Sequence, residues 1–359
     1  MSSQVLYSSF QLGPTQLKNR VVMAPMTRSR STGNVPGEMV ARYYAQRSEA
    51  GLIITEGTAP SPNGLGYARI PGLFNSEHVK AWKGVTDAVH KEGSKIFVQL
   101  MHTGRVGHPL NLPAGARVLG PSAVALKGEM YTDAQGPQPH PTPEMMTEAD
   151  ILAAIEEFAR SAELALKAGF DGVELHGANG YLIDQFLNAA SNTRRDTWGG
   201  SVENRVRFAV EVARATAKRI GNERVGMRLS PYGAFNGTIA DDATPQLYAL
   251  LASELKQLGL VYVHIVDHAT MGAPAVPVDV KRSIQKEFGG TIILSGGYDA
   301  ARAEAGLAEK HGELVAFGRP FISNPRLVSK MRSGTPLVPP DMTRLYTPGE
   351  SGYTDYPVA

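Results

Sequence analysis

Eight short apolar runs, rich in Val, Ile and Leu, recur along the chain with longer amphipathic segments between them. Continuous apolar runs of this length are typical of parallel strands buried on both faces. The runs are residues 20–25, 52–56, 95–100, 171–176, 225–230, 261–266, 291–295 and 314–317. Eight β/α units without a domain break predict one α/β domain over residues 1–359, a (β/α)8 TIM barrel. A doubly wound sheet shares the alternation and is the alternative fold.

Helix signals stand between several of these predicted strands. Residues 147–150 have the capping-box pattern, and the apolar side chains that follow share one face of a helix. Thr244 before Pro245 predicts a helix cap and a proline in the first turn. Asp299 is expected to cap the helix after the seventh strand. These signals support the alternation of strands and helices.

Three segments stand outside the alternation. We expect an N-terminal hairpin before the first barrel strand. Residues 101–147, rich in Pro and Gly, form an insertion after the third strand, and the apolar stretch 122–126 within it predicts a hairpin. Since barrel active sites lie at the C-terminal ends of the strands, we expect the insertion to cap that mouth, with a plain spacer as the alternative. The tail 333–359 is expected to bring Tyr353 back to the same mouth.

Composition narrows the classes of partner and chemistry. The formal net charge is +2, from 36 basic and 34 acidic residues that are mixed along the chain, so we expect neither a nucleic-acid nor a membrane partner. The chain has no cysteine, which excludes disulfides, thiolate nucleophiles and Cys-based metal sites. It shows no signal-peptide pattern and no apolar stretch long enough to span a membrane, so we predict a cytoplasmic protein.

Two neighbouring strand ends carry the residue types of a phosphate site. Gly296 and Gly297 follow the seventh strand and let backbone N–H groups approach an anion. Gly318 and Arg319 follow the eighth strand, and the Arg guanidinium can bind phosphate through two hydrogen bonds. Two tight turns with a surface arginine are the alternative. The occurrence of both signals at adjacent strand ends favours phosphate binding.

The fourth strand ends in a second cluster, which contains His176, Asn179 and Tyr181. The glycines between them allow a sharp turn, so the three side chains can converge at the mouth. His and Asn can both donate to one oxygen and stabilise negative charge that develops there. A Tyr hydroxyl, with an ordinary pKa of about 10, can protonate a carbanion or enolate. A core histidine, a turn asparagine and a half-buried aromatic are the alternative reading.

Three further polar residues lie where an apolar core would not select them: Thr27, Gln99 and Arg228. Together they supply donors and acceptors suited to a planar heterocycle with several carbonyl and nitrogen edges. A ligand with a flat polar ring and a phosphate is a mononucleotide. FMN has this composition.

A metal site is the competing chemistry. His264 and His268 are four residues apart, and His102 and His108 lie in the insertion, but no convergent set of carboxylates accompanies them. We therefore expect no metal. The sequence also lacks a nucleophile elbow, a Rossmann glycine pattern and a P-loop at a strand-to-helix turn.

An ordered set of motifs, nearly end to end, resembles the old yellow enzyme family of FMN-dependent ene-reductases. The motifs are residues 20–28, 51–56, 98–105, 174–187, 191–192, 199–205, 317–320 and 352–357. The resemblance implies a non-covalently bound FMN at the C-terminal mouth of the barrel. The residues expected to bind it are Ala24, Pro25, Met26, Thr27, Gly57, Gln99, Arg228, Gly296, Gly297, Gly318 and Arg319.

The resemblance also implies roles in the reaction. His176 and Asn179 would hydrogen-bond a carbonyl or nitro oxygen of the substrate, and Tyr181 would donate the proton. Tyr67 and Tyr353 resemble pocket-lining aromatics. Met101 stands where many relatives carry Trp, and a narrower, flexible thioether is expected to widen or reshape the substrate pocket.

The implied activity is a two-step exchange at one site. NADPH or NADH delivers hydride to flavin N5, and an activated alkene then takes the hydride from N5 and a proton from Tyr181. Enones, enals, nitroalkenes, maleimides and nitrate esters are the expected substrates. An isomerase or aldolase acting on a phosphorylated substrate, or a non-catalytic flavin-binding protein, are the alternatives. The sequence leaves open the choice between a monomer and a homodimer.

Overall fold

A computed structural model describes residues 4–358, and its centre is a closed barrel of eight parallel strands. Around the barrel the strands follow one another in chain order, and β14 pairs with β3 to close the ring. The barrel strands are β3 (Val21–Met23), β4 (Leu52–Thr58), β5 (Lys95–Leu100), β10 (Gly172–Gly177), β11 (Val225–Leu229), β12 (Tyr262–Val266), β13 (Thr291–Ser295) and β14 (Leu314–Phe317). Closure confirms the TIM barrel and excludes the doubly wound sheet.

The predicted strands agree closely with the observed ones. Three predicted ranges, 95–100, 291–295 and 314–317, are the ranges of β5, β13 and β14. The largest differences are at β3, which is three residues shorter than the predicted range 20–25, and at β4, which runs two residues further to Thr58 and shifts register between Ile54 and Gly57. The continuous burial of these strands explains why they could be recognised in the sequence as apolar runs.

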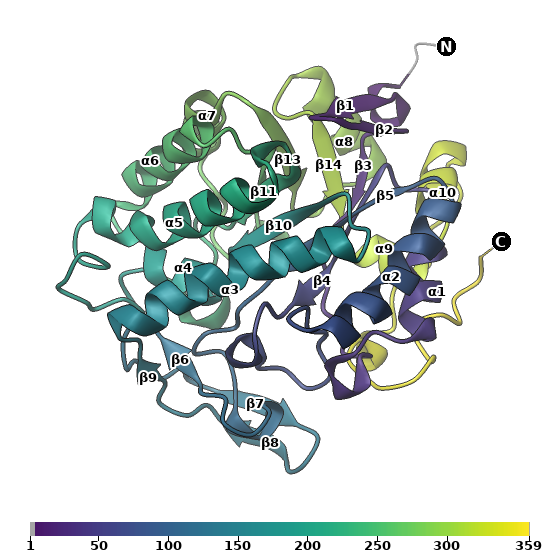
Figure 1. The fold of residues 1–359 in the computed structure, drawn as a ribbon. Coiled ribbons are helices and arrows are strands. Elements are labelled where there is room, and N and C mark those ends of the chain that lie inside the picture. The colour runs from purple at the N-terminus through teal and green to yellow at the C-terminus, as the bar shows by residue number, and fades with distance from the viewer. Residues whose placement is uncertain (1–3, 359) are drawn as a thin grey trace.

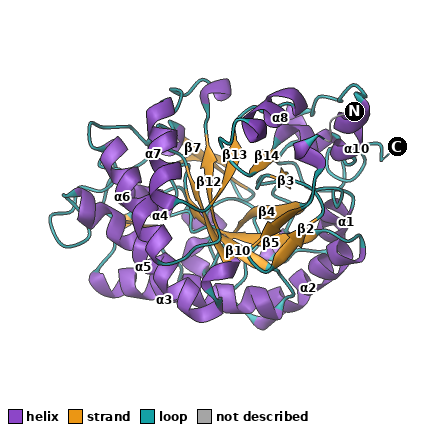
Figure 2. Ribbon diagram, turned by 90° about the horizontal axis from the view of Figure 1, so that it is seen from above, coloured by secondary structure: helices purple, strands orange, loops and turns teal. Residues whose placement is uncertain are grey.

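Helices form a ring outside the strands, as the view down the barrel shows (Figure 2). They are α1 (Glu38–Ala45), α2 (Ser76–Lys91), α3 (Glu148–Lys167), α4 (Leu182–Leu187), α5 (Val202–Ile220), α6 (Thr244–Gln257), α7 (Val278–Phe288), α8 (Ala300–Ala308), α9 (Arg319–Ser323) and α10 (Leu327–Ser333). The capping box of α3 and the Asp299 cap of α8 are both confirmed. The cap of α6 is Ala243, one residue before the predicted Thr244, because the Thr244 hydroxyl instead donates to Asp241 at 3.0 Å.

The predicted N-terminal hairpin is confirmed, and it closes one end of the barrel. Strands β1 (Phe10–Leu12) and β2 (Thr15–Leu17) pair antiparallel. Leu12 and Leu17 are buried in one cluster with residues that begin the barrel strands and fill its interior, among them Leu52 and Leu314. The floor of the barrel is therefore apolar and sealed, and the polar chemistry is left to the opposite end.

The insertion after β5 carries short strands below the barrel in Figure 1. They are β6 (Leu119–Gly120), β7 (Glu129–Thr132), β8 (Gly136–Pro139) and β9 (Glu144–Met145), and β7 pairs antiparallel with β8. The prediction of a hairpin at 122–126 is wrong, since the hairpin lies just after it. The apolar stretch forms bends instead, with Val124 N–H donating to Ser122 at 2.8 Å and the Val124 carbonyl accepting from Arg105.

The C-terminal tail follows α10 and crosses the end of the molecule that carries the insertion. Within it a single 3-10 turn, η8 (Met342–Arg344), is defined. Across residues 4–358, no helix combines the length and the apolar character that a membrane crossing requires.

Candidate active site

A cavity of about 690 Å³ opens at the C-terminal ends of the barrel strands. Its wall includes Thr27 after β3, Gln99 on β5, His176 on β10 and Arg228 on β11, so adjacent parts of the barrel each contribute a polar side chain. The other predicted residues in the wall are Pro25, Tyr67, Met101, Asn179 and Tyr181. Its volume lies within the range of small-molecule and cofactor sites.

Strand register brings polar residues into line near the C-terminal ends of the barrel strands. His176 on β10 pairs with Arg228 on β11, which pairs with His264 on β12, while Glu174 pairs with Gln99 on β5. Because side chains alternate along a strand, residues in register point to the same side of the sheet. The interior of the barrel at this level is therefore polar.

Glu174 is the centre of a buried hydrogen-bond network beneath the cavity. Its side chain is fully buried and accepts from Gln99 Nε2 at 2.8 Å, from the Tyr262 hydroxyl at 3.1 Å and from His264 Nδ1 at 2.8 Å. The bond from Gln99 uses its amide nitrogen, so the amide oxygen is left to accept a hydrogen bond from a ligand. This network fixes the orientation of Gln99.

Arg228 brings a buried positive charge to the same wall. Its side chain is 6 % exposed, and Nε has no hydrogen-bond partner among the described residues. Burial lowers the Arg228 pKa, and the nearby Glu174 carboxylate opposes that change. An unsatisfied buried guanidinium is costly, so this geometry calls for a ligand with hydrogen-bond acceptors or negative charge.

These residues fit the pyrimidine edge of a flavin. That edge presents alternating N–H and C=O groups, and the wall offers an acceptor at Gln99, donors at Arg228 and a hydroxyl at Thr27. The unpartnered Arg228 Nε is the observation that favours the fit, because a dry apolar ligand would leave it unsatisfied.

His176 and Asn179 point donors at the cavity from the end of β10. His176 is 4 % exposed, and its Nδ1 has no partner among residues 4–358. Burial, reinforced by the Arg228 charge, lowers the His176 pKa well below 6.5, so the imidazole is neutral. The Asn179 backbone is left-handed, with φ of 61°, and lies in the turn between β10 and α4.

Tyr181 lies beside this pair. Its ring meets the His176 ring edge-on at a centroid distance of 4.9 Å, and its hydroxyl oxygen is 3.1 Å from that of Tyr67. Burial raises the Tyr181 pKa above 10, so the phenol keeps its proton at neutral pH. A protonated hydroxyl in this position can act as an acid.

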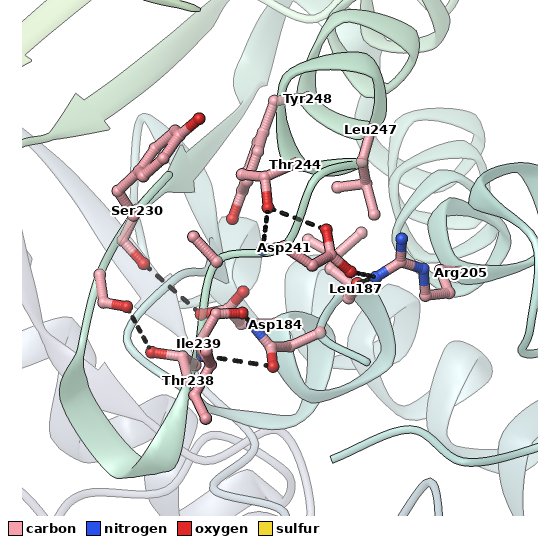
Figure 3. Close-up of a pocket in the computed structure, with 14 residues that line it drawn as sticks. Asp184, Leu187, Arg205, Ser230, Thr238, Ile239, Asp241, Thr244, Leu247 and Tyr248 are labelled. Carbon is pink, nitrogen blue, oxygen red and sulfur yellow. Dashed lines mark hydrogen bonds and ion pairs between the residues drawn. The ribbon is translucent and has the colours of Figure 1, made fainter. Parts of the chain in front are cut away.

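Asp184, on α4, supports the turn that joins β10 to α4, and Figure 3 shows it beside Ser230. The Asp184 carboxylate accepts from Gly180 N–H at 2.8 Å and from the Ser230 hydroxyl at 3.4 Å. Burial raises the Asp184 pKa to about 7. The adjoining cavity, about 20 Å³ in volume and lined by Asp184, Ser230 and Tyr248, has room for a water molecule but not for a substrate.

The residues predicted to hold a phosphate lie outside the wall of the large cavity, at the ends of β13 and β14. Gly296 and Gly297 have positive φ values of 130° and 66°, conformations that favour glycine. A Cβ on Gly318 would lie 3.6 Å from Met26 Sδ and 3.9 Å from Ala24, so the structure gathers these three residues at one strand end. Arg319 is exposed, and no described acidic residue forms an ion pair with it.

Gly57 on β4 contacts Met101, the residue after β5. A Cβ on Gly57 would lie 2.4 Å from Met101 Sδ, so the Met101 side chain would have to move. Met101 is 1 % exposed yet borders the cavity. In this structure Gly57 therefore makes room for Met101, a packing reason for glycine that the sequence did not reveal.

Tyr353 does not line this cavity, contrary to the prediction. Its side chain is fully buried and stacks on Tyr43 with ring centroids 4.0 Å apart, and Arg30 lies over its ring. The aromatic residue that the tail does bring to the cavity is Tyr346, seven residues earlier. Burial between α1 and the tail makes Tyr353 an anchor for the tail.

Sequence reasoning missed the part of the wall that loops contribute. These residues come from the insertion, from the tail and from the loops after β3, β4 and β11: Ser29, Ala68, Arg69, Val106, Glu129, Met130, Tyr131, His140, Asn236, Thr343, Tyr346, Thr347 and Pro348. Aromatic residues in otherwise polar loops, such as Tyr131 and Tyr346, were the one available signal.

The histidines considered as metal ligands have other partners. His264 bonds Glu174, His268 Nε2 lies 2.8 Å from Asn179 Oδ1, and His102 Nδ1 accepts from Gly104. Within residues 4–358 there is no group of three His, Cys, Asp or Glu side chains that could hold a metal ion.

Comparison with known proteins decides the family. Residues 5–337 match the NADH:flavin oxidoreductase / NADH oxidase family. The chain belongs to this family. It is 42 % identical over 363 residues to "Chanoclavine-I aldehyde reductase fgaOx3" of Penicillium roqueforti (strain FM164), with 98 % of this chain and 95 % of the relative covered. It is 38 % identical over 361 residues to "Probable flavin mononucleotide-dependent alkene reductase" of Leishmania infantum, with 99 % and 98 % covered.

A solved structure gives the same result for the fold. The old yellow enzyme homologue from Zymomonas mobilis superposes with a TM-score of 0.94 at 37 % identity, over 98 % of this chain and 99 % of that one. The resemblance to old yellow enzymes is thereby confirmed. As a member of the family, this flavoprotein uses FMN and NAD(P)H and is an ene-reductase.

Proposed function

We propose that this enzyme reduces the C=C bond of alkenes conjugated to a carbonyl or nitro group, with His176 and Asn179 binding the oxygen and Tyr181 donating the proton. The observation that carries the proposal is the convergence of these three side chains on one cavity that also exposes Gln99 and Arg228. Enones, enals, nitroalkenes and maleimides share the required oxygen next to the double bond.

FMN would be held non-covalently across the barrel mouth. Thr27, Gln99 and Arg228 would bind its pyrimidine edge, the backbone at Ala24, Pro25 and Met26 would lie beside the ring with Gly57 near, and Gly296, Gly297, Gly318 and Arg319 would bind its phosphate. Bound FMN supplies the means to take hydride from NADPH or NADH and to pass it to the alkene. The Arg228 charge favours a ligand that becomes anionic.

His176 and Asn179 act on the oxygen of the substrate. Electron density moves onto this oxygen when hydride adds to the β-carbon, and a neutral imidazole N–H and an amide NH2 stabilise it by hydrogen bonding. The low pKa of His176 keeps the imidazole uncharged, so it donates without proton transfer. Removing one such donor typically lowers the rate by about 10² to 10³.

Tyr181 completes the addition at the α-carbon. The raised pKa of Tyr181 keeps its proton in place until a strongly basic carbon forms. Tyr67, with its hydroxyl 3.1 Å away, holds the Tyr181 hydroxyl in the cavity.

Two observations speak against the alternatives. An aldolase of the Schiff-base class needs a lysine, and no described lysine borders the cavity. A protein that only binds flavin has no use for a proton donor beside an oxygen-binding pair. Cytoplasmic location, and assembly as a monomer or a homodimer, stay predictions from the sequence.

Product analysis tests the proposal. Purified holoenzyme is incubated with NADPH and 2-cyclohexenone, and the products are separated by gas chromatography. Reduction of the alkene gives cyclohexanone in equal amount to the NADPH consumed. Formation of 2-cyclohexenol, or no NADPH consumption with any enone, enal or nitroalkene, would contradict the proposed function.

A further inference from the structure

Asn179 is held by its backbone on both sides. Its N–H donates to the Ser230 hydroxyl at 2.8 Å, and its carbonyl accepts from Asn236 Nδ2 at 2.7 Å. These bonds fix a left-handed backbone with φ of 61° and place the side chain at the cavity wall. They do not fix the amide itself, because the last side-chain torsion of asparagine has two broad wells that exchange the oxygen and the nitrogen.

His268 supplies the missing restraint. Its Nε2 lies 2.8 Å from Asn179 Oδ1, and the side chain is 8 % exposed. An amide oxygen only accepts, so this contact requires the Nε2–H tautomer of His268. With the oxygen engaged, the Nδ2 group has no acceptor among the described residues and is available to the cavity.

Further contacts fix the position of His268 and its imidazole ring. His268 lies two residues after β12, and its ring meets the Phe235 ring edge-on with centroids 4.6 Å apart. Its carbonyl accepts from Met271 N–H at 2.8 Å, and the preceding Asp267 pairs with Lys281 at 2.6 Å. Burial and the Arg228 charge lower the His268 pKa to about 4, so the ring is neutral at ordinary pH.

His268 does not border the cavity, so a contribution to the reaction has to pass through Asn179. In the opposite orientation the Asn179 oxygen would face the cavity and repel the substrate oxygen. With His268 in the Nε2–H tautomer, that orientation would bring two N–H groups together, so this tautomer opposes it.

We propose that His268 is the positioning residue of the oxygen-binding pair: its Nε2–H holds the Asn179 oxygen, so that the Asn179 NH2 group faces the carbonyl or nitro oxygen of the alkene. The inference rests on the proposed function, because it gives Asn179 a role only if that oxygen binds there.

Two substitutions separate the hydrogen bond from packing. His268→Leu removes the donor and keeps an apolar side chain against Phe235, whereas His268→Gln returns an N–H near the position of Nε2. Two quantities are measured for each variant: the rate of flavin reoxidation by 2-cyclohexenone in the pre-reduced enzyme, and the dissociation constant of 2-cyclohexenone from the oxidised enzyme, which cannot reduce it. FMN content and the unfolding midpoint identify variants that fail to fold.

We expect His268→Leu to slow reoxidation and to weaken enone binding by about tenfold each, the loss of one ordinary hydrogen bond. His268→Gln should recover both to within about threefold of the wild type. In an Asn179→Ala background, His268→Leu should cause no further loss, because coupled residues are not additive.

Three results would overturn the inference: wild-type behaviour of His268→Leu, a His268→Gln variant as impaired as His268→Leu in a folded, FMN-loaded protein, or losses that add in the double variant. Failure of the proposed function looks different. In that case the wild type itself does not reduce the enone, or Asn179→Ala binds and reduces it like the wild type. The binding measurement needs no turnover, so it tests the role of His268 even where the wild type does not reduce the enone.

Discussion

The hydroxyl oxygens of Tyr67 and Tyr181 lie 3.1 Å apart on one side of the cavity. Their rings meet nearly at right angles, with centroids 6.2 Å apart, so the two phenols approach edge to face. Tyr181 also packs against His176, whereas Tyr67 comes from the loop after β4. Tyr181 therefore lies next to the oxygen-binding residues, and Tyr67 supports Tyr181 from the side.

Replacing Tyr181 with Phe should slow the alkene half-reaction by about 10² to 10⁴, the usual contribution of a positioned acid. Flavin reduction by NADPH needs no proton from this group and should keep its rate within about twofold. Anaerobic stopped-flow absorbance measures the two half-reactions separately. Tyr67→Phe is the matched control and should cost less than Tyr181→Phe. Full alkene turnover by Tyr181→Phe would show that the proton comes from elsewhere.

The tail depends on buried arginines that donate to its backbone. Arg30 donates to the carbonyls of Arg344 at 2.8 Å and Ser351 at 3.0 Å, and it also binds the Leu345 carbonyl. We expect Arg30→Met to increase hydrogen exchange in residues 341–352 while the barrel strands stay protected, because the tail opens locally.

The same change should raise KM for the enone, since Tyr346 and its neighbours leave the cavity wall. Arg42→Met is the control. It removes an exposed ion pair with Glu350 at 3.0 Å, a contact worth at most about 1 kcal/mol. Equal exchange in the two variants would show that the tail is held by other contacts.

Met101 borders the cavity and packs against Gly57. Met101→Trp should lower kcat/KM for a bulky polycyclic enone by about tenfold or more and change it little for 2-cyclohexenone. The indole would clash with the larger substrate alone, at a cost of about one or two kcal/mol. Steady-state kinetics with both substrates measures the ratio. Equal losses with both substrates would mean that the indole disturbs FMN binding, and unchanged kcat/KM values for both would contradict the assignment of Met101 to the substrate side.

The buried carboxyl group of Asp184 should make the stability of the fold depend on pH. Burial raises its pKa from the ordinary 3.8 to about 7, so the folded protein holds a proton that the unfolded chain releases. The stabilisation is complete below about pH 4 and is lost as the pH rises through 7. Asp184→Asn lacks this dependence, and its free energy of unfolding relative to the wild type should rise by up to about 1.4 kcal/mol per pH unit between pH 5 and 7.

Urea unfolding at several pH values measures this difference. Asp87→Asn removes an exposed carboxylate paired with Lys83 and is the control for a change of charge elsewhere. A constant difference between Asp184→Asn and the wild type would contradict a buried, protonated Asp184. A relative loss with rising pH would show that the carboxylate is ionised and stabilised by Gly180 N–H and Ser230.

The barrel and the strand-end residues could be predicted from the sequence because both depend on local patterns. Buried strands such as β13 appear as apolar runs, and polar residues within or after them, such as Gln99 and Arg228, stand out against that background. Parallel strands in chain order then bring their C-terminal ends together.

Residues whose position depends on long-range packing could not be predicted in this way. Tyr353 and Tyr346 are both tail aromatics, and Tyr353 is the buried one because it stacks on Tyr43 and because distant arginines bind the backbone of the tail. The hairpin of the insertion was misplaced because the apolar stretch 122–126 packs as bends against Arg105. His268 was considered as a metal ligand, and its contact with Asn179 joins residues 89 positions apart.

The visible absorption spectrum of the purified protein during anaerobic addition of NADPH, and then of 2-cyclohexenone, tests the central claim most directly. A cavity that holds FMN beside His176, Asn179 and Tyr181 predicts a yellow protein that bleaches with NADPH and regains its colour with the enone. A protein that bleaches but stays colourless with enones, enals and nitroalkenes would contradict the assignment of these three residues to alkene reduction. A colourless protein that takes up no added FMN would contradict the flavin site itself.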